Sequence, residues 1–342
     1  MEKKSNNFLI VNHGHILSYN IVLALQERDL LKTFITSYYK GKNKFLDFIF
    51  GAKAERRYLK GIKKKYVRNF IISDILYLLV KKFSKNRNLL NYSIRFRSLI
   101  LQYISIFYLI FFKYEYLVSW ESNSYFLFKY ALKKKKIKKI LIFGHIFLPY
   151  EIELLKKDSV INPEVSSSYK IYENKKFIER IIKEIQFSDY IIVSSTFGKK
   201  SLLKYGVNKE KIFVNTLGYD TKFQKLINYN TITKPVNILF VGGVSQRKGI
   251  KFVFQVLDKI SSTNYLLHIV GPSKINLRIF DKYKVNYKYY GQVSQKKLFE
   301  IYSKCNIFFL PSILEGFGIV ILEAMAAGLV VLTSVNSCAP DV

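Results

Sequence analysis

Acidic residues, cysteine, methionine and tryptophan are all scarce in this 342-residue sequence. It contains 24 Asp and Glu against 56 Lys and Arg, with two Cys, two Met and one Trp. The cysteines, Cys305 and Cys338, form no Cys-x-x-Cys pair, and this excludes both a disulfide framework and a zinc site built on paired cysteines. Such cysteine usage fits a reducing compartment.

Long apolar segments are also missing. The first apolar run, 8–11, stops at Asn12 and is too short for the apolar core of a signal peptide, so we interpret it as a buried strand. The run 99–112 is apolar except for Gln102 and Ser105, but its 14 residues fall short of the ~20 that cross a bilayer. The sequence therefore predicts no membrane span.

The formal charge of +32 leaves two explanations open. Abundant Lys, Asn, Ile, Phe and Tyr are typical of an AT-rich genome, in which case the charge reflects codon usage. Alternatively, the charge serves an anionic partner: a phosphate-bearing substrate, an acidic membrane surface or nucleic acid. The sequence lacks a helix-turn-helix, a zinc motif and the aromatic-basic pattern of nucleic-acid-binding sheets, so no nucleic acid partner is expected.

Strand-like and helix-like runs alternate along the chain, which is typical of a doubly wound parallel sheet in an α/β protein. A hydrophobic content of 49% supports buried cores, and 342 residues suit two domains. Residues 228–235 lack periodicity and contain turn formers, so we interpret them as a linker between domains at 1–227 and 236–342. The predicted strands are 7–11, 33–36, 116–119, 139–143 and 190–193 in the first domain, and 236–241, 265–270, 307–310 and 330–333 in the second. The predicted helices are 16–28, 249–260, 295–303 and 318–327.

The segment 308–326 carries the strongest functional signal. A strand runs into a loop containing Gly316 and Gly318, and a helix then begins. Glycines let a backbone approach a ligand closely, and a helix start presents free N–H groups that attract phosphate. In an open parallel sheet, ligands bind at the carboxyl ends of the strands. Glu315 in the loop and Glu323 in the helix are therefore candidates to face one crevice.

These two glutamates lie in Pro-Ser-x-x-Glu-Gly-Phe-Gly-x-x-x-x-Glu-Ala-Met-Ala, with seven residues between them. The pattern resembles the E-x7-E motif of the family 4 retaining glycosyltransferases (glycosyl transferases group 1). The resemblance is good over 184–342, weaker at 8–40 and 140–151, and absent across 41–115. Further segments that follow the family's order are 184–195, 205–207, 211–212, 218–220, 240–249, 269–271, 291–293 and 305–308.

The resemblance implies a GT-B fold, with two Rossmann-like domains facing a cleft. The first domain would bind an acceptor and the second an NDP-sugar, and transfer would retain the anomeric configuration. Family members continue for several elements past the end of this chain, so we expect the second domain to be incomplete at its C-terminal end. A catalytically inactive GT-B scaffold is the alternative.

The same resemblance implies roles for particular residues. Lys248 matches the lysine at the donor diphosphate, Glu323 the glutamate that binds the nucleotide ribose, and Glu315 the glutamate at the donor sugar. The backbone of Gly316–Gly318, through the amides around Phe317 and Gly318, would hold the diphosphate. No metal and no other cofactor is expected, and the chain contains no Asp-x-Asp motif.

Two further assignments complete the predicted donor site. The family often has arginine where this chain has Gly243, and we expect Arg247 to supply the second positive charge. His145 resembles the family's histidine at the donor sugar and is a candidate catalytic residue with Glu315. His268 lies within a predicted strand and is interpreted as a core histidine.

The loop after the first strand contains Gly14 between two histidines. Gly14 is a candidate donor-binding residue in a loop that faces the cleft. His13 and His15 either line that loop or have a structural role, and the sequence leaves both alternatives open.

A basic region with apolar runs lies in the first domain. Between Lys53 and Arg97 there are 14 basic residues against Glu55 and Asp74. The runs 69–80 and 99–112 are interpreted either as core helices or as interfacial helices at an anionic membrane. We expect a cytoplasmic bacterial hexosyltransferase, peripheral on the inner face of the cell membrane. Its acceptor would be a carbohydrate or lipid-linked molecule in cell-surface polysaccharide or glycolipid synthesis.

Overall fold

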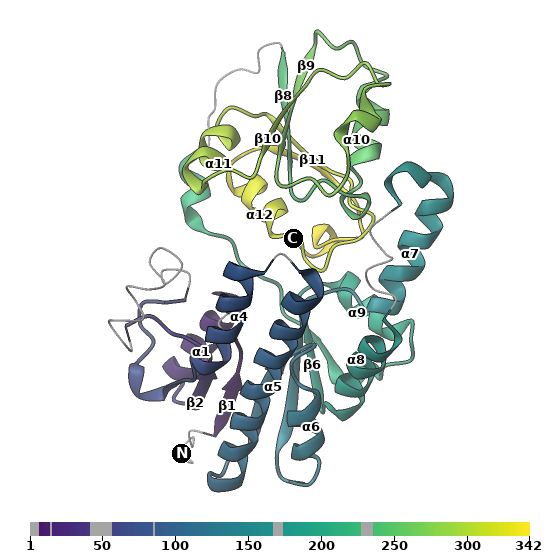
Figure 1. Ribbon diagram of the computed structural model, residues 1–342. Helices are drawn as coiled ribbons and strands as arrows, with labels where there is room; N and C mark the ends of the chain where they lie inside the picture. Colours follow the sequence, from purple (N-terminus) through teal and green to yellow (C-terminus); the bar gives the residue numbers. More distant parts are fainter. Residues whose placement is uncertain (1–6, 14–15, 42–56, 85, 167–173, 227–234) are drawn as a thin grey trace. The chain divides into compact units, whose positions relative to one another are not determined.

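A computed structural model of the chain describes residues 7–13, 16–41, 57–84, 86–166, 174–226 and 235–342 (Figure 1). Its contacts divide the chain into two compact units. The first unit is Met1–Phe143 with Glu179–Ile192, and the second is Gly144–Ile178 with Val193–Val342. The expected linker at 228–235 lies outside the described residues apart from its last position, so the predicted domain boundary stays a prediction. Gly14 also lies outside them.

The first sheet has seven strands in the order β3-β2-β1-β4-β5-β6-β7. The pairings of β1 with β2 and β4, of β2 with β3 and of β4 with β5 are parallel. All five strands predicted in this half are confirmed, with ends shifted by at most two residues. The strands are β1 (Phe8–Val11), β2 (Leu31–Thr36), β3 (Val67–Asn69), β4 (Tyr116–Trp120), β5 (Lys138–Phe143), β6 (Tyr190–Val193) and β7 (Ile212–Val214).

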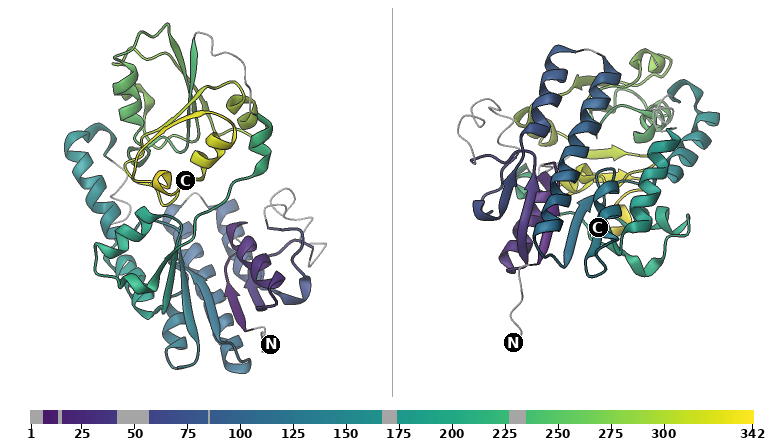
Figure 2. Two further views of the ribbon diagram at one scale, coloured as in Figure 1. Left: turned by 180° about the vertical axis from the view of Figure 1, so that it is seen from behind. Right: turned by 60° about the horizontal axis from the view of Figure 1, so that its bottom comes forward.

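Two helices that lie side by side follow β3 in the chain: α4 (Ile72–Phe83) and α5 (Arg87–Phe111). Figures 1 and 2 show them as neighbouring helices coloured dark blue, and α5 also contacts α6 (Tyr125–Ala131). The apolar run at 99–112, predicted to be too short to span a bilayer, lies within the longer helix α5. By length and composition alone, the stretch Leu89–Phe111 of this helix could cross a membrane, and 28% of its most apolar window is buried.

The second sheet has five parallel strands in the order β10-β9-β8-β11-β12. Four of them match the predicted strands. The fifth, β10, is half-buried and has no continuous apolar run, so its sequence gave little signal. The strands are β8 (Val236–Val241), β9 (Tyr265–Val270), β10 (Tyr287–Gly291), β11 (Ile307–Leu310) and β12 (Val330–Thr333).

The predicted helices are confirmed within a few residues at their ends. The remaining helices are α1 (Ile16–Glu27), α7 (Leu148–Ile161), α8 (Lys175–Phe187), α9 (Thr196–Leu203), α10 (Ile250–Leu257), α11 (Gln295–Tyr302) and α12 (Ile319–Ala326). Short 3-10 helices lie at Lys64–Tyr66, Pro163–Val165, Lys209–Lys211, Thr221–Leu226, Gln246–Lys248, Leu277–Phe280 and Ala339–Asp341.

The core of the second unit lies on both faces of its sheet. Phe240 of β8 and Phe308 of β11 are fully buried, and Phe254 of α10 stacks on Phe280 with ring centroids 4.3 Å apart. Burial on both faces explains why these strands have nearly continuous apolar sequences. His268 is 7% exposed and hydrogen-bonds through both ring nitrogens, to Tyr290 Oη and Asn237 Oδ1, which confirms it as a core histidine.

Candidate functional site

Glycines bring three strand ends of the second sheet close together. Gly271, after β9, has φ +133°, and a Cβ there would lie 2.1 Å from the carbonyl oxygen of Gly242, after β8. Gly249, before α10, has φ +68°, and a Cβ there would lie 1.9 Å from the carbonyl oxygen of Pro311, after β11. Side chains at Gly249 and Gly271 are therefore excluded. The turn after β8 consequently lies directly against the loop after β11.

This packing joins two of the predicted site residues. Lys248 Nζ lies 2.6 Å from Glu315 Oε1, and the two side chains are 19% and 7% exposed. The aliphatic part of the Lys248 side chain packs against Gly242, where an added Cβ would lie 3.3 Å from Lys248 Cε. A carboxylate buried this deeply requires a paired charge, and Lys248 supplies it.

Arg247 adds a second positive charge beside this pair. Its Nη2 lies 3.9 Å from Glu315 Oε2, and its Nη1 lies 3.9 Å from Glu151 Oε1 on α7. Its Nε donates to the carbonyl oxygen of Leu314 at 3.4 Å. Two cations and two carboxylates therefore meet at the carboxyl ends of β8 and β11, and the side chain of Arg247 is 25% exposed.

The loop that carries Glu315 is held from two sides. Ile313 N–H donates to the carbonyl oxygen of Arg247 at 2.9 Å, and Glu315 N–H donates to that of Asn336 at 2.8 Å. Asn336 Nδ2 donates in turn to the carbonyl oxygen of Ile313 at 2.9 Å. Sequence reasoning missed Asn336, whose role depends on a loop beyond β12 folding back onto the Glu315 loop.

Gly316 occupies a position where the backbone must pass close to other segments. Its carbonyl oxygen accepts hydrogen bonds from Ser195 Oγ at 2.6 Å and Ser194 Oγ at 3.2 Å. A Cβ at Gly316 would lie 2.3 Å from the carbonyl oxygen of Gly144 and 3.1 Å from His145 Cα. The structure thus brings the backbone of His145 to the Glu315 loop, while the His145 side chain is exposed.

Helix α12 begins immediately after this loop. Gly318 precedes it with φ +86°, and no side chain caps the helix. An uncapped helix start has N–H groups directed at its loop and attracts anions. Phe317 is 5% exposed, and its carbonyl oxygen accepts a hydrogen bond from Cys338 N–H at 3.0 Å. The Phe317 side chain therefore anchors the loop in the core while its backbone reaches the helix start.

Glu323 lies on α12 and has a different partner. Tyr302 Oη donates to Glu323 Oε2 at 3.5 Å. Burial raises the pKa of Glu323, the hydrogen bond from Tyr302 lowers it, and Asp220 raises it further. In the part of the chain that is described, no ion pair or hydrogen bond joins Glu323 to Lys248 or Glu315, so the site has two separate acidic positions.

A second residue that sequence reasoning missed is Gln246, which is 2% exposed. Its Nε2 donates to the carbonyl oxygen of Leu155 at 2.9 Å, to Asp158 Oδ2 at 2.8 Å and to Ser159 Oγ at 2.9 Å, all on α7. These bonds fix the turn that carries Lys248. The only feature of the sequence that could have indicated this role is the position of Gln246 directly before the two cations Arg247 and Lys248.

Three of the predicted site residues, Arg247, Lys248 and Glu315, thus meet through their side chains, and His145 and Gly316 meet through the backbone. Phe317, Gly318 and Glu323 belong to the same loop and helix. This arrangement can hold an anion between the cations and the start of α12, and can present carboxylates to hydroxyl groups.

Known proteins resemble this chain over parts of its length. Residues 222–342 match the family model described as "Glycosyl transferases group 1". The Klebsiella pneumoniae "Uncharacterized 41.2 kDa protein in cps region" is 30% identical over 224 residues, which are 63% of this chain and 58% of that protein. The Erwinia amylovora "Amylovoran biosynthesis glycosyltransferase AmsK" is 23% identical over 191 residues, which are 52% and 46% of the two chains. The chain spans about half the length of these relatives.

Similar solved structures cover nearly the whole chain. One is "lipopolysaccharide outer core galactosyltransferase WaaB apo form", with TM-score 0.56, 16% identity and coverage of 98% of this chain and 81% of that one. Another is "Crystal structure of Anabaena Alr3699/HepE in complex with UDP and glucose", with TM-score 0.54, 13% identity and coverage of 98% and 82%. With its two parallel sheets, the chain has the expected GT-B fold. The match to the group 1 model is confined to residues 222–342, within the second unit.

Proposed function

We propose that this protein is a retaining glycosyltransferase that moves a hexose from an NDP-sugar to an acceptor hydroxyl in bacterial cell-surface polysaccharide or glycolipid synthesis. The observation that carries the proposal is the Lys248–Glu315 pair beside the uncapped start of α12. The group 1 family match covers both residues, and the names of the two relatives refer to a cps region and to amylovoran biosynthesis.

In the proposed complex, the donor diphosphate lies between Lys248, Arg247 and the first turn of α12. Negative charge grows on the nucleotide as the glycosidic bond breaks, and preorganised cations and amides stabilise that charge without rearrangement. These groups supply the neutralisation that a divalent metal ion supplies elsewhere, so the proposed reaction requires no metal.

The two glutamates have separate tasks in this proposal. Glu323 accepts hydrogen bonds from the ribose hydroxyls, and its half-buried position strengthens such bonds. Glu315 and His145 contact the donor sugar at the reaction centre. In this proposal the departing phosphate accepts the proton of the acceptor hydroxyl.

A thermal-shift comparison of UDP, GDP and ADP tests the proposal. A nucleotide that binds only the folded state raises the melting temperature as its concentration exceeds Kd. At a concentration of 100 Kd it adds ~2.7 kcal/mol to the free energy of unfolding. One nucleotide is expected to stabilise the wild type and to lose most of that effect in Glu323→Ala. If no nucleotide or nucleotide sugar shifts the melting temperature, the proposed function is wrong.

The proposed location is the cytoplasmic face of an anionic membrane, and α5 supplies the first reason. Its packed face is mostly small or polar, whereas its exposed face is apolar and aromatic. The packed face contains Ser98, Leu101, Gln102, Ser105 and Leu109. The exposed face contains Leu89, Tyr92, Phe96, Tyr103, Phe107, Ile110 and Phe111, each at least 46% exposed. Exposed apolar side chains gathered on one face of a helix mark an interaction site.

Helix α4 extends this surface with four exposed aliphatic residues and an exposed Phe83. The aliphatic residues are Ile72, Ile75, Leu76 and Leu79. We call the exposed apolar residues of α4 and α5 together the α4–α5 face. Lys81, Lys82 and Arg95 on the same helices are exposed and suited to anionic headgroups.

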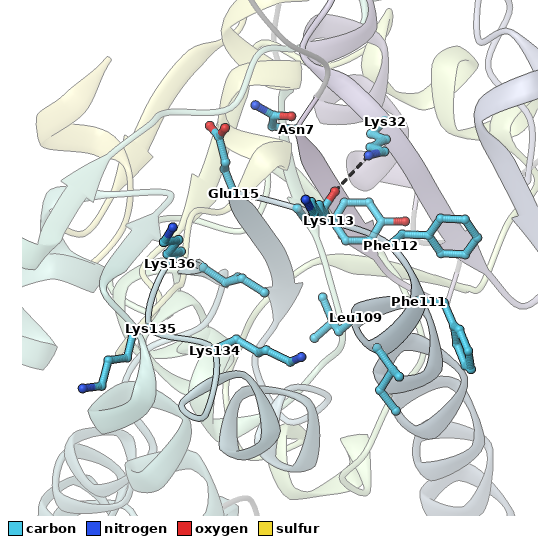
Figure 3. Close-up of a pocket in the computed structure, with 13 residues that line it drawn as sticks. Asn7, Lys32, Leu109, Phe111, Phe112, Lys113, Glu115, Lys134, Lys135 and Lys136 are labelled. Carbon is cyan, nitrogen blue, oxygen red and sulfur yellow. Dashed lines mark hydrogen bonds between the residues drawn. The ribbon is translucent and has the colours of Figure 1, made fainter.

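A basic pocket of about 640 Å³ lies beside the C-terminal end of α5 (Figure 3). Its acidic side chain is Glu115, whereas its basic side chains are Lys32, Lys113, Lys134, Lys135 and Lys136. Lys32 Nζ donates to the carbonyl oxygen of Lys113 at 2.9 Å, which holds two sides of the pocket together. Phe111 and Phe112 line the same pocket. Aromatic rings beside a cluster of lysines match the boundary between acyl chains and anionic headgroups.

A further inference from the structure

Four adjacent strands of the first sheet end in one polar row. The parallel register pairs Val11 of β1 with Ile35 of β2 and with Ser119 of β4, and pairs Thr36 of β2 with Asn69 of β3. His13 follows β1, and its carbonyl oxygen accepts a hydrogen bond from Ser37 Oγ at 3.0 Å. Polar side chains of four neighbouring strands therefore lie at one edge, where open parallel sheets bind ligands.

Buried polar atoms gather along this row without a hydrogen-bond partner among the described residues. The atoms are His13 Nδ1, Thr36 Oγ1, Asn69 Oδ1, Ser119 Oγ and, from α1, Tyr19 Oη. Nearly all buried polar atoms in proteins have partners, so a group of exceptions requires an explanation. Side chains that can donate and accept, directed to one edge of a sheet, are suited to a polar ligand.

The row also carries an excess of positive charge. Arg57 Nη1 lies 2.8 Å from Asp74 Oδ2, and Arg97 Nη1 lies 3.0 Å from Asp74 Oδ1. Two guanidinium groups thus share one carboxylate, which is 1% exposed, while they are 21% and 18% exposed. Arg57 Nη1 also donates to the carbonyl oxygen of His13 at 3.1 Å, so the charges adjoin the strand ends. Arg97 Nε is buried without a partner in the described structure.

His13 and Tyr19 are uncharged at neutral pH, so they do not change the excess of positive charge in the row. Burial, with the charges of Arg97 and Arg57, lowers the pKa of His13 to about 3, so its imidazole is uncharged at neutral pH. Burial raises the pKa of Tyr19, which keeps its hydroxyl protonated. Around Asp74 the row therefore offers two cations and several neutral donors to one anion.

We propose that this strand-end cluster, formed by His13, Tyr19, Thr36, Arg57, Asn69, Asp74, Arg97 and Ser119, binds a phosphate group carried by the acceptor. The inference rests on the proposed function, because it names the acceptor class of the same enzyme. Guanidinium groups bind phosphate through two parallel N–H bonds, and such charge-assisted bonds are stronger than neutral ones.

The phosphate belongs either to a lipid carrier or to a water-soluble sugar phosphate, and the ligands of the following titration distinguish the two sources.

The sole tryptophan provides a local reporter. Trp120 ends β4, directly after Ser119, and is partly buried. Its fluorescence in the full chain is to be titrated with decyl phosphate, decanol and glucose 1-phosphate, each below any micelle concentration. Decyl phosphate is expected to change the signal with saturation and decanol to leave it unchanged. Saturable binding of glucose 1-phosphate with an equal Kd would assign the phosphate to a soluble acceptor.

Arg57→Gln removes a positive charge from the cluster, Asp74→Asn removes a negative charge, and Arg97→Lys keeps the charge but removes the guanidinium group. Arg57→Gln and Arg97→Lys are expected to weaken decyl phosphate binding about tenfold, since each removes a charge-assisted bond or the guanidinium fork. Asp74→Asn is expected to tighten binding, because it removes the carboxylate that competes for both arginines. Tighter binding cannot result from a damaged fold. Arg28→Gln, an exposed change after α1, is the matched control and should bind as the wild type does.

Two outcomes would overturn the inference. One is equal decyl phosphate affinity in the wild type, Arg57→Gln and Asp74→Asn. The other is a decanol response as large as that of decyl phosphate. Nucleotide stabilisation of the same variants reports on the second unit independently. A variant that keeps its nucleotide shift therefore tests the phosphate site alone. If the wild type bound decyl phosphate but no nucleotide, the proposed function would be refuted while the phosphate site would stand.

Discussion

Lys248 Nζ lies 2.6 Å from Glu315 Oε1, so the cation proposed to bind the donor is also the partner of a buried carboxylate. A diphosphate that binds Lys248 must compete with Glu315 for it. Arg247, 3.9 Å from the other oxygen of Glu315, is placed to compensate the carboxylate when Lys248 turns to the diphosphate. Lys248 and Arg247 therefore have different tasks in the proposed complex: Lys248 binds the diphosphate, and Arg247 compensates the charge of Glu315.

Lys248→Met is expected to weaken binding of the nucleoside diphosphate about tenfold or more, because it removes a charge-assisted contact and leaves Glu315 short of a partner. Calorimetric titration measures the change. Lys259→Met, at an exposed position after α10, is the matched control. An unchanged affinity in Lys248→Met would contradict the proposed position of the diphosphate.

Glu323→Ala and Glu315→Ala are expected to fail in different ways. Glu323 has Tyr302 as its partner and belongs to the proposed ribose site, so its loss should chiefly raise Kd for the nucleotide. Glu315 belongs to the proposed reaction centre, so its loss should chiefly lower kcat. Initial rates with varied donor concentration separate the two effects. Wild-type rates and affinities in both variants would refute the assignment of the site.

The fold of the second unit could be predicted from the sequence because its strands are buried on both faces. Phe308 and Phe240 belong to apolar runs that periodicity detects directly. Strand β10 escaped prediction because Tyr287–Gly291 is only half-buried. The contacts of Asn336 with the Glu315 loop and of Gln246 with α7 also escaped prediction, since side chains that meet through tertiary folding leave no periodic pattern.

The spacing of Glu315 and Glu323, with the basic turn at Lys248, identified the principal side chains of the candidate site. The sequence could not show that Lys248 and Glu315 are ion-paired, because that contact depends on the close packing of Gly249 against Pro311. For the run 99–112 it left core and interfacial helices as alternatives. The exposed face of this helix is apolar and its packed face is mostly small or polar, so hydrophobicity alone points to the wrong face. The burial of Gln102, whose Oε1 accepts a hydrogen bond from Phe126 N–H of α6, helps to show which face is covered.

Glu184 is expected to make the stability of the first unit depend on pH. Burial raises the pKa of Glu184 to about 7, although three backbone N–H groups, of Ser122, Ser124 and Tyr125, donate to its carboxylate. With a folded pKa above the unfolded value, the contribution of Glu184 is fully present below pH ~4.5 and is lost as pH rises to about 7.

The measurement is urea unfolding at several pH values for the wild type and Glu184→Gln. The wild type should lose on the order of 3 kcal/mol relative to the variant between pH ~4.5 and ~7. Parallel stability curves for the two proteins would contradict the raised pKa.

Transfer activity is expected to survive excess EDTA. Lys248, Arg247 and the start of α12 are proposed to neutralise the donor diphosphate, so no bound metal is needed for that task. Rates with a purified acceptor should be equal with and without EDTA. A strict requirement for added Mg²⁺ or Mn²⁺ would show that these groups do not suffice.

Binding to vesicles is expected to require anionic lipid and to weaken with salt. The basic pocket and the α4–α5 face supply the two components, electrostatic attraction and apolar insertion. Each lysine near an anionic surface contributes ~1 kcal/mol, so changing Lys134, Lys135 and Lys136 together to Gln should lower the partition coefficient by about two orders of magnitude at low salt.

The apolar component is tested by Phe107→Ser with Phe111→Ser, which should reduce binding that remains at high salt. Both side chains are more than half exposed, so neither change opens a cavity in the core. Val160→Ser with Ile161→Ser, on the exposed end of α7, is the matched control and should bind as the wild type does. Co-sedimentation with neutral and anionic liposomes measures each variant. Equally weak binding in all conditions would refute the proposed location on an anionic membrane. Wild-type binding that resists salt and carbonate and is reversed only by detergent would instead show that α5 inserts into the bilayer.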